Sequence, residues 1–231
     1  MSSDFASRQR SANAKYYSSK GKAIYSDFTT FAQGKALAAC NAAEFVRDFA
    51  NYRAAVVCEY GVGKGDFAKN FLDEVKKKDA KLYAKTTYHL SDFSEKMLSG
   101  ARKNLATHAK ICIFHHFDAS SQPPSQEFDY CRVNELLTDL PAEIYYRKGS
   151  QIFTHGSAKR IQPGLFASKF LERIEEGRAM PFNFKAEEFV LNLCKLGRPG
   201  FRIDLFDYGF YSADDVQLLP VGEWNRLMVR N

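Results

Sequence analysis

Glu59-Tyr-Gly-Val-Gly-Lys-Gly65 is the stretch that decides the fold, because an apolar run at residues 54–58 precedes it and a helical pattern follows it. A short continuous apolar run is typical of a strand that is buried on both faces of a parallel sheet. From residue 66 to about residue 77, apolar side chains recur at helical spacing. Glycines in the turn remove the Cβ atoms that would keep a ligand away from the backbone. The segment therefore predicts a strand, a ligand-binding turn and a helix.

The same alternation of strand and helix continues along the chain. Further strand patterns occupy residues 82–90, 111–114, 128–133 and 201–206, and further helical patterns occupy residues 34–50, 93–107, 164–177 and 185–196. Two antiparallel pairs are predicted at residues 143–153 and at residues 216–219 with 226–230. Strands that alternate with helices predict an α/β fold, a Rossmann-like, doubly wound, mostly parallel sheet. An N-terminal helical extension and an inserted hairpin and helical segment before strand five complete this prediction.

The chain divides into an arm and one domain. Residues 1–33 are predicted to form a flexible N-terminal arm, because the start is rich in serine and basic residues. Residues 34–231 are predicted to form a single domain with an insert at about residues 142–200. The arm would suit a mitochondrial presequence in composition, but Asp4 and the lack of an apolar face argue against it. We therefore expect a cytoplasmic protein, with the mitochondrial matrix as the alternative in a eukaryote.

Composition limits the partners that the protein can have. A formal net charge of +6 favours an anionic cofactor, an acidic protein surface or nucleic acid. The 5 cysteines are scattered and form no CxxC pair, which is typical of reduced thiols. Adjacent residues of a strand point to opposite faces, so His115 and His116 cannot chelate one ion, and we expect no metal. No apolar run is long enough to cross a bilayer, so we expect no membrane partner.

The acid directly before the glycines distinguishes between ligands. Dinucleotide folds carry a GxGxxG pattern, with an acid only at the end of the second strand. Here Glu59 stands at the end of the first strand, and Gly61, Gly63 and Gly65 are spaced differently, which favours a ligand with a cationic amine and no pyrophosphate. S-adenosyl-L-methionine carries such an amine, so we expect it as the cofactor, and a glycine turn without a ligand is the alternative. A Walker loop is excluded because no Ser or Thr follows Gly63-Lys.

Acidic side chains also follow the next two predicted strands. Asp92 stands where the chain leaves the second strand and could accept hydrogen bonds from both hydroxyls of a ribose. Alternatively, it caps the following helix in a capping box with Glu95. Asp118 follows the third strand and would accept from an adenine amino group, with a loop-capping role as the alternative. Phe93 or Phe117 would pack on the adenine ring.

Three segments outside the glycine loop carry a resemblance to a known family. They read Asp27-Phe-Thr-Thr30, Asn134-Glu-Leu-Leu-Thr-Asp-Leu-Pro141 and Asp207-Tyr-Gly209. With the glycine loop, their order and spacing over about residues 25–210 resemble the class I S-adenosylmethionine-dependent methyltransferases, and more narrowly the MidA-like family, whose mitochondrial members methylate arginine in a complex I subunit. The resemblance implies that Thr29 and Thr30 lie in a segment that folds over the cofactor. It also implies methylation of a protein side chain, at an arginine nitrogen.

The acceptor is expected at the end of the fourth strand. Asn134 and Glu135 would bind it, with Glu135 pairing a guanidinium so that a nitrogen lone pair faces the methyl group. Asp139 would assist, although residues 138–140 read Thr-Asp-Leu where the family has Asp-Ala-Leu. The alternative is that Asn134 caps a short helix and Glu135 is solvated.

Other functions stay open beside protein methylation. A nucleic-acid methyltransferase would carry an Asn/Asp-Pro-Pro-aromatic motif after the fourth strand or a Pro-Cys nucleophile. Gln122-Pro-Pro-Ser125 precedes that strand and lacks the aromatic residue, and Cys131 has no proline before it. A protein substrate is therefore expected and a nucleic-acid partner is not favoured. An RNA or small-molecule methyltransferase, a non-catalytic cofactor-binding assembly factor and an NAD-dependent oxidoreductase remain the alternatives.

Overall fold

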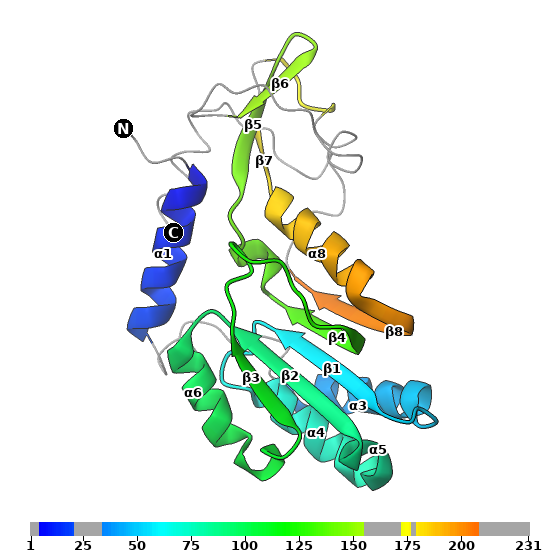
Figure 1. Ribbon diagram of the computed structural model, residues 1–231. Helices are drawn as coiled ribbons and strands as arrows, with labels where there is room; N and C mark the ends of the chain where they lie inside the picture. The colour runs from blue at the N-terminus through cyan, green and yellow to red at the C-terminus, as the bar shows by residue number, and fades with distance from the viewer. Residues whose placement is uncertain (1–4, 21–33, 155–171, 177–178, 208–231) are drawn as a thin grey trace. The chain divides into compact units, whose positions relative to one another are not determined.

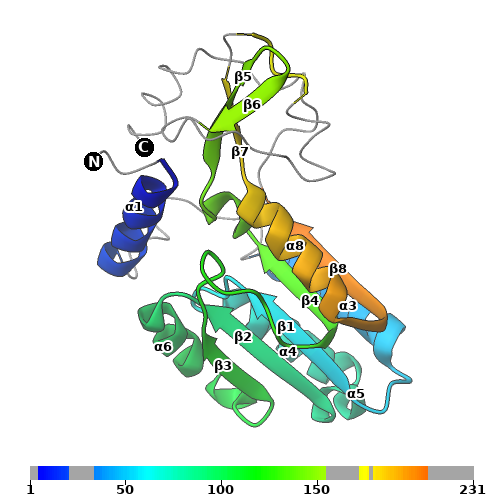
Figure 2. The same ribbon diagram turned by 45° about the horizontal axis from the view of Figure 1, so that its top comes forward.

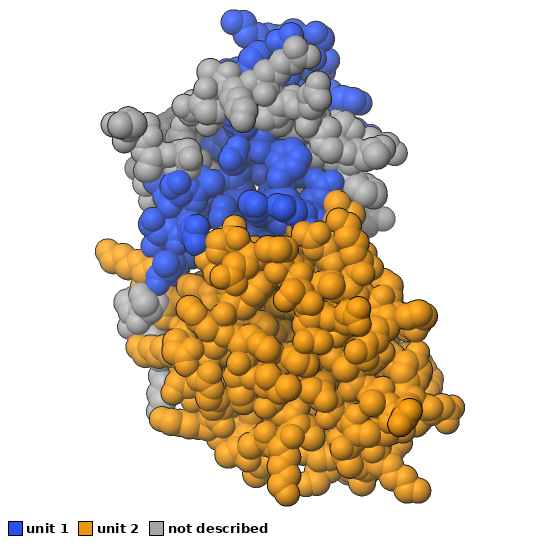
Figure 3. All heavy atoms as spheres, viewed as in Figure 1, with its two compact units in different colours: residues 1–14, 137–188, 208–231 blue, residues 15–136, 189–207 orange. Residues whose placement is uncertain are grey.

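The computed structural model describes residues 5–20, 34–154, 172–176 and 179–207, and it divides the chain into two compact units (Figure 3). Unit 1 contains residues 1–14, 137–188 and 208–231, and unit 2 contains residues 15–136 and 189–207. The glycine loop belongs to unit 2. The sequence predictions for residues 27–30, 216–219 and 226–230 lie outside the described residues. Of the helix predicted at residues 164–177, only residues 172–176 are described, and they form a turn and a β-bridge of Glu176 with Arg147, so the helix prediction is wrong there.

Unit 2 is built on a 5-stranded sheet with the strand order β3-β2-β1-β4-β8 (Figure 1). The strands are β1 (Ala55–Tyr60), β2 (Thr86–Asp92), β3 (Cys112–His116), β4 (Phe128–Asn134) and β8 (Gly197–Phe206). Every neighbouring pair is parallel, so the carboxyl ends of all these strands lie at one edge. The sheet confirms the predicted Rossmann-like α/β fold.

Helices cover both faces of this sheet (Figures 1 and 2). One face carries α3 (Lys35–Phe49), α4 (Asp66–Lys78) and α6 (Glu95–Asn104), and the other carries the part of α8 (Phe184–Leu196) that belongs to unit 2. In α4, Asp66 lies in the first turn and a run of lysines lies in the last, which favours the helix dipole at both ends. The 3-10 turn η3 (Ala106–His108) follows α6.

A short helix replaces the first part of one predicted strand. Helix α5 (Ala80–Ala84) occupies the residues where the strand was expected to begin, and β2 begins only at Thr86. The side chain of Asp79 accepts from the backbone N–H groups of Lys81 and Leu82, which stabilises a helix start. The capping interaction therefore outweighs the apolar pattern that suggested a strand.

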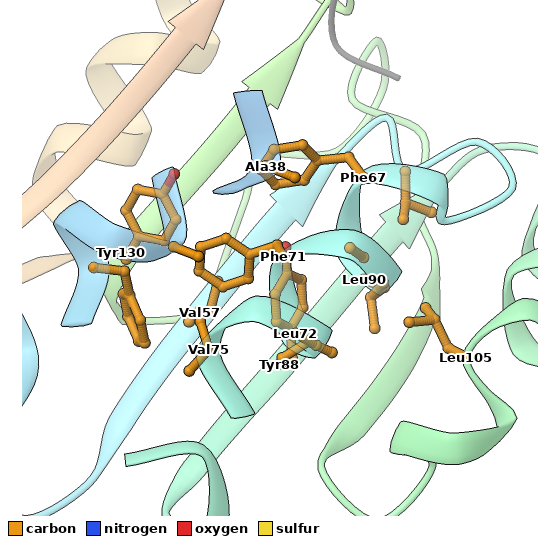
Figure 4. Close-up of a cluster of buried hydrophobic side chains, with 14 of the residues drawn as sticks. Ala38, Val57, Phe67, Phe71, Leu72, Val75, Tyr88, Leu90, Leu105 and Tyr130 are labelled. Carbon is orange, nitrogen blue, oxygen red and sulfur yellow. The ribbon is translucent and has the colours of Figure 1, made fainter. Parts of the chain in front are cut away.

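The main core of unit 2 fills the space between the sheet and α3, α4 and α6 (Figure 4). Val57, Tyr88 and Tyr130 come from three neighbouring strands, face the same side and are at most 1% exposed. Phe71 of α4 stacks on Tyr130 with 5.8 Å between the ring centroids. This packing fixes α4, and therefore the glycine loop before it, against the sheet.

Unit 1 contains a 3-stranded antiparallel sheet with the order β6-β5-β7. Strands β5 (Glu143–Lys148) and β6 (Gln151–Thr154) form the predicted hairpin, which turns at Gly149 with a φ of 58°. Strand β7 (Ala179–Phe182) was not predicted, because it is short and contains a proline, which cannot donate to a sheet. A small cluster around Ile144, Ile174 and Met180 forms the core of this unit.

A helix, α1 (Phe5–Lys20), lies where the sequence predicted a flexible arm. In unit 1, the Gln9 amide donates to the Leu140 carbonyl at 3.3 Å and accepts from the Ala142 N–H at 2.8 Å. Asn13 donates to the Asp139 carbonyl at 2.9 Å. These contacts are made by polar side chains, so a search for apolar periodicity does not find the helix.

Candidate functional site

The carboxyl ends of β1, β2 and β4 bring the candidate residues of unit 2 to one edge of the sheet. Strand β1 lies between β2 and β4, so the strand order reverses there. In open α/β sheets, ligands bind outside the carboxyl ends of the strands at such a point. Glu59 of β1 is directly opposite Leu90 of β2 and Arg132 of β4. The candidate site is therefore centred on Glu59 and the loop that follows it.

The glycine loop has a backbone that side chains would not allow. Gly61 and Gly65 have φ values of 76° and 75°, in the left-handed region that favours glycine. A Cβ at Gly65 would lie 3.0 Å from Leu105 Cδ1, so α6 also packs closely on the loop. A Cβ at Gly61 would lie 3.5 Å from the Asn134 carbonyl oxygen and 3.5 Å from Leu136 Cβ. The loop is thus a rigid turn that lies against the segment following β4.

Glu59 is a buried carboxyl group, with only 3% of the residue exposed. The hydroxyl of Tyr88 donates to Glu59 Oε2 at 2.8 Å. Burial raises the pKa of Glu59 to about 7, against the opposing effects of the Arg132 charge and the Tyr88 hydrogen bond. A cationic group bound here would favour the carboxylate form, so this side chain is suited to a ligand amine.

Asp92 has a different contact from the one expected in a capping box. Its Oδ2 accepts from the Gly63 N–H at 2.9 Å, and its Oδ1 accepts from the Ser94 N–H at 2.8 Å. The N-cap of α6 is Ser94, whose hydroxyl accepts from the Met97 N–H. The capping alternative for Asp92 is therefore wrong. The side chain instead ties the glycine loop to the end of β2.

The residues proposed for adenine come from two loops. Phe93 follows β2, and Phe117 and Asp118 follow β3. Asp118 Oδ1 accepts from the N–H and the hydroxyl of Ser120, at 2.9 and 2.5 Å, which is the loop-capping geometry. The ring of Phe117 packs edge-on against Tyr60, with 5.4 Å between centroids. The ring of Phe93 packs edge-on against Tyr17, also at 5.4 Å.

The segment after β4 places Asn134 and Glu135 beside the glycine loop. Glu135 has a φ of 48°, and it is the one residue other than glycine with a positive φ in the described parts of the chain. Its N–H donates to the Phe206 carbonyl at 2.7 Å. Asn134 Oδ1 accepts from Arg132 Nη2 at 3.4 Å. Because a guanidinium can only donate, the Asn134 oxygen must face Arg132 and its NH₂ group is turned away.

Asp139 belongs to the other unit. It ends the 3-10 turn η4 (Leu137–Asp139), and its backbone carbonyl accepts from Asn13. Thr29 and Thr30 lie outside the described residues. Unit 2 therefore brings together Glu59, the glycines, Asp92, Asn134 and Glu135.

Sequence reasoning missed Arg132, which is 0% exposed in the middle of β4. Its Nη1 donates to Asn41 Oδ1 of α3 at 3.0 Å. The sequence did contain a signal for this residue, because a charged side chain stands inside a strand that is predicted to be buried on both faces. Such a charge is rarely buried without a partner.

The described part of the chain offers neither a cluster of metal-ligating side chains nor a helix that could span a membrane. No cluster of three or more His, Cys, Asp or Glu side chains suitable for a metal ion occurs there. None of the helices described combines the length and the apolar character that spanning a membrane requires.

The site fits S-adenosylmethionine. A buried carboxyl group at the end of β1 can take the amine, a glycine turn allows close approach, and an acid follows β2. The fold and the site together are those of the class I S-adenosylmethionine-dependent methyltransferases. A model of the family described as "Putative S-adenosyl-L-methionine-dependent methyltransferase" matches residues 37–194, which is more than half of the chain. The chain belongs to this family.

Solved structures share the fold of this chain. A Burkholderia thailandensis protein bound to S-adenosyl-homocysteine is 18% identical, with a TM-score of 0.56 over 77% of this chain and 48% of that chain. Another B. thailandensis structure is 18% identical, with a TM-score of 0.58 over 93% of this chain and 65% of that chain. The DhpI-SAM-HEP complex is 14% identical, with a TM-score of 0.50 over 91% and 70% of the two chains. At such identities the likeness concerns the fold.

The chain spans about half to two thirds of the length of the two B. thailandensis proteins, at 48% and 65%. No curated protein sequence matches it.

Proposed function

We propose that this protein transfers the methyl group of S-adenosylmethionine to a protein side chain, at an arginine nitrogen, as its resemblance to the MidA-like family implies. The observation that carries the proposal is the left-handed backbone of Glu135, in a segment that lies against Gly61. A non-glycine residue in this region costs about 1 kcal/mol or more and persists where its surroundings enforce it. Such strain concentrates at functional sites.

The donor half of the site is proposed around β1 and β2. Glu59 would hold the amine of the cofactor, and the glycine loop would lie along its amino-acid part. Asp92, already fixed by the Gly63 N–H at 2.9 Å, would accept from the ribose hydroxyls. Phe93 or Phe117 would pack on adenine. For Asp118, its hydrogen bonds to Ser120 support the loop-capping role over adenine binding.

The acceptor half is proposed at the end of β4. Bound S-adenosylmethionine supplies an activated methyl group on a sulfonium, so the protein has mainly to orient the acceptor for an in-line displacement. Glu135 would form a charge-assisted pair with the guanidinium and would accept the proton that the nitrogen loses as the N–CH₃ bond forms, the S–CH₃ bond breaks and S-adenosylhomocysteine leaves. The NH₂ group of Asn134, turned away from Arg132, would donate to an oxygen of the peptide that carries the arginine.

The experiment is Glu135→Gln with Glu127→Gln as its matched control, because Glu127 precedes the opposite end of the same strand. Methylarginine formed in protein extracts is measured by mass spectrometry, and S-adenosylmethionine affinity by calorimetry. We expect Glu135→Gln to abolish transfer with cofactor affinity within about twofold of the unmodified protein, whereas Glu127→Gln retains both. Loss of transfer and affinity together, or of neither, would contradict the role of Glu135. Methylation of an RNA or a small molecule alone would contradict the arginine acceptor.

A further inference from the structure

Arg132 carries a buried charge that the proposed reaction has not yet used. Its guanidinium lies over the ring of Phe67 at 3.4 Å from the centroid and is fully buried. Its Nη atoms donate to the side-chain oxygens of Asn41 and Asn134, and its Nε has no hydrogen-bond partner among the described residues. Burying a cation without a bonded carboxylate is costly, so a compensating role is expected.

Asn41 links Arg132 to the carboxylate of Asp204, but Asp204 has no direct hydrogen bond with Arg132. Asp204 accepts from Asn41 Nδ2 at 2.9 Å and from the Tyr130 hydroxyl at 2.7 Å. It also accepts from Arg202 Nε at 2.8 Å, which gives it a cation of its own. The charge of Arg132 therefore remains available to its other neighbour, Glu59.

Glu59 and Arg132 are direct partners across β1 and β4. Neighbouring strands are about 4.8 Å apart, so two side chains on the same face at partnered positions lie near each other. Glu59 contacts Tyr88, and Arg132 contacts Phe67, both of which belong to the core beneath α3 and α4. The two side chains therefore share this buried face, where low polarity strengthens their attraction.

We propose that Arg132 is a positioning residue for the methyl-donor site: its buried guanidinium holds Glu59 as a carboxylate and so gives the site its preference for a ligand with a cationic amine. This inference rests on the proposed placement of the cofactor amine at Glu59. Arg132 acts through Glu59, and the direct contact with the ligand is made by Glu59.

None of the other described groups that act on Glu59 is a cation, although the Tyr88 hydrogen bond also lowers the pKa of Glu59. Asp92 of β2 raises the pKa of Glu59 by repulsion. Tyr88 donates its hydrogen bond and stays neutral, because burial raises its own pKa well above the usual value. Burial also keeps the thiols of Cys112 and Cys131 neutral, since it raises the pKa of Cys112 to about 12 and raises the pKa of Cys131 well above its usual value. Arg132 is thus the single cation that acts on Glu59 among the described groups.

The first test measures Glu59 in the ligand-free protein, by following its side-chain ¹³Cδ resonance with pH. We expect a midpoint of about 7 in the unmodified protein. In Arg132→Met the midpoint rises by about one unit or more, because the cation is lost. In Arg132→Lys, which keeps the charge, it stays within roughly half a unit. An unchanged midpoint in Arg132→Met, or an equal rise in both variants, overturns the proposal.

The second test compares S-adenosylhomocysteine with 5′-methylthioadenosine, which lacks the amine, by calorimetry at pH 7. At pH 7, a rise of about one unit in the Glu59 midpoint, from about 7, cuts the carboxylate fraction and so lowers the affinity ratio of the two ligands by about fivefold in Arg132→Met. Glu59→Gln, with Arg132 intact, is the control: it gives the affinity ratio of the two ligands for a site that has no carboxylate. A purely structural role of Arg132 would instead weaken both ligands equally.

The two proposals fail in different ways. If Glu59→Gln leaves the affinity ratio of the two ligands unchanged, the amine does not bind at Glu59 and the proposed donor site is wrong. This holds even if the titration midpoint of Glu59 shifts in the Arg132 variants. If Arg132→Met does not fold in a thermal unfolding assay, Arg132→Gln removes the charge and retains a polar group that can reach Asn41. The same rise in midpoint is expected there, and its absence contradicts the inference.

Discussion

Different interactions stabilise the candidate residues within unit 2 and within unit 1. In unit 2, the segment that carries Glu59 and the glycine loop is fixed by a large buried core, which includes Phe71 and Tyr88 at 0% exposure. In unit 1, the segment that carries Asp139 is fixed by side chains that bond to its backbone. Asn183 Nδ2 donates to the carbonyls of Leu137 and Leu140, both at 2.8 Å. Burial therefore sets the geometry of the proposed donor site, whereas hydrogen bonds set that of residues 137–142.

The largest expected effect comes from removing core volume in unit 2. Phe71→Ala should lower the free energy of unfolding by about 3 to 5 kcal/mol, because it leaves a cavity against Tyr88 and Tyr130. Phe201→Ala, at a position that is 38% exposed, is the control and should cost far less. Urea titration followed by circular dichroism measures both. Equal losses would show that this core does not dominate stability.

The burial of Glu59 predicts a pH dependence of stability. Its pKa rises from 4.5 to about 7 in the folded protein, so the folded state binds more protons than the unfolded state between these values. The contribution of Glu59 to stability is therefore present below about pH 4.5 and is lost as the pH rises to about 7, by roughly 3 kcal/mol in total. Glu59→Gln cannot titrate at this position, so the variant should not show this decrease in stability. The free energy of unfolding of the variant minus that of the unmodified protein should therefore increase from pH 5 to pH 8. A constant difference across this range would contradict the raised pKa.

Two glycines with similar φ values separate backbone strain from packing. Gly65→Ala in unit 2 combines a φ of 75° with a contact of 3.0 Å to Leu105 Cδ1 and should cost about 1 to 3 kcal/mol. Gly149→Ala in unit 1 has a φ of 58° and no atom within 4 Å of the new Cβ, so it should cost about 1 kcal/mol. Thermal unfolding compares the two. A smaller loss at Gly65 would contradict the close packing of α6 on the loop.

A small effect is also expected from the hydrogen bonds of unit 1. Asn183→Ala removes two donors to residues 137 and 140 and the acceptor for the Ala186 N–H at the start of α8, at a cost of about 1 to 2 kcal/mol. Amide hydrogen exchange should accelerate at residues 137–142. Asn192→Ala, later in α8, is the matched control. Unchanged exchange in Asn183→Ala would show that other contacts hold this segment.

Most of unit 2 could be predicted from the sequence because burial leaves a pattern. The apolar run before Glu59 and the helical spacing after Gly65 indicated β1 and α4 correctly. The errors came from polar side chains that bond locally. Asp79 begins α5 where a strand was expected, and Ser94 rather than Asp92 caps α6.

Apolar patterns do not predict contacts between residues that are far apart in the sequence. Helix α1 binds residues 139–142 through Gln9 and Asn13, which have no apolar period. Arg132 meets Asn41 across 91 positions of sequence, so only the folded chain brings them together. Glu135 has a left-handed φ and donates its N–H to the carbonyl of Phe206, and no residue type in the motif signals this backbone.

The most direct test of the account is calorimetric binding of S-adenosylhomocysteine to the unmodified protein, to Glu59→Gln and to Asp92→Asn, with NAD as the competing ligand. We predict one site per chain, an affinity about tenfold to a hundredfold weaker in Glu59→Gln because a charge-assisted contact is lost, and no binding of NAD. Binding of NAD in place of S-adenosylhomocysteine, or full affinity in both variants, would contradict a methyl-donor site at the end of β1.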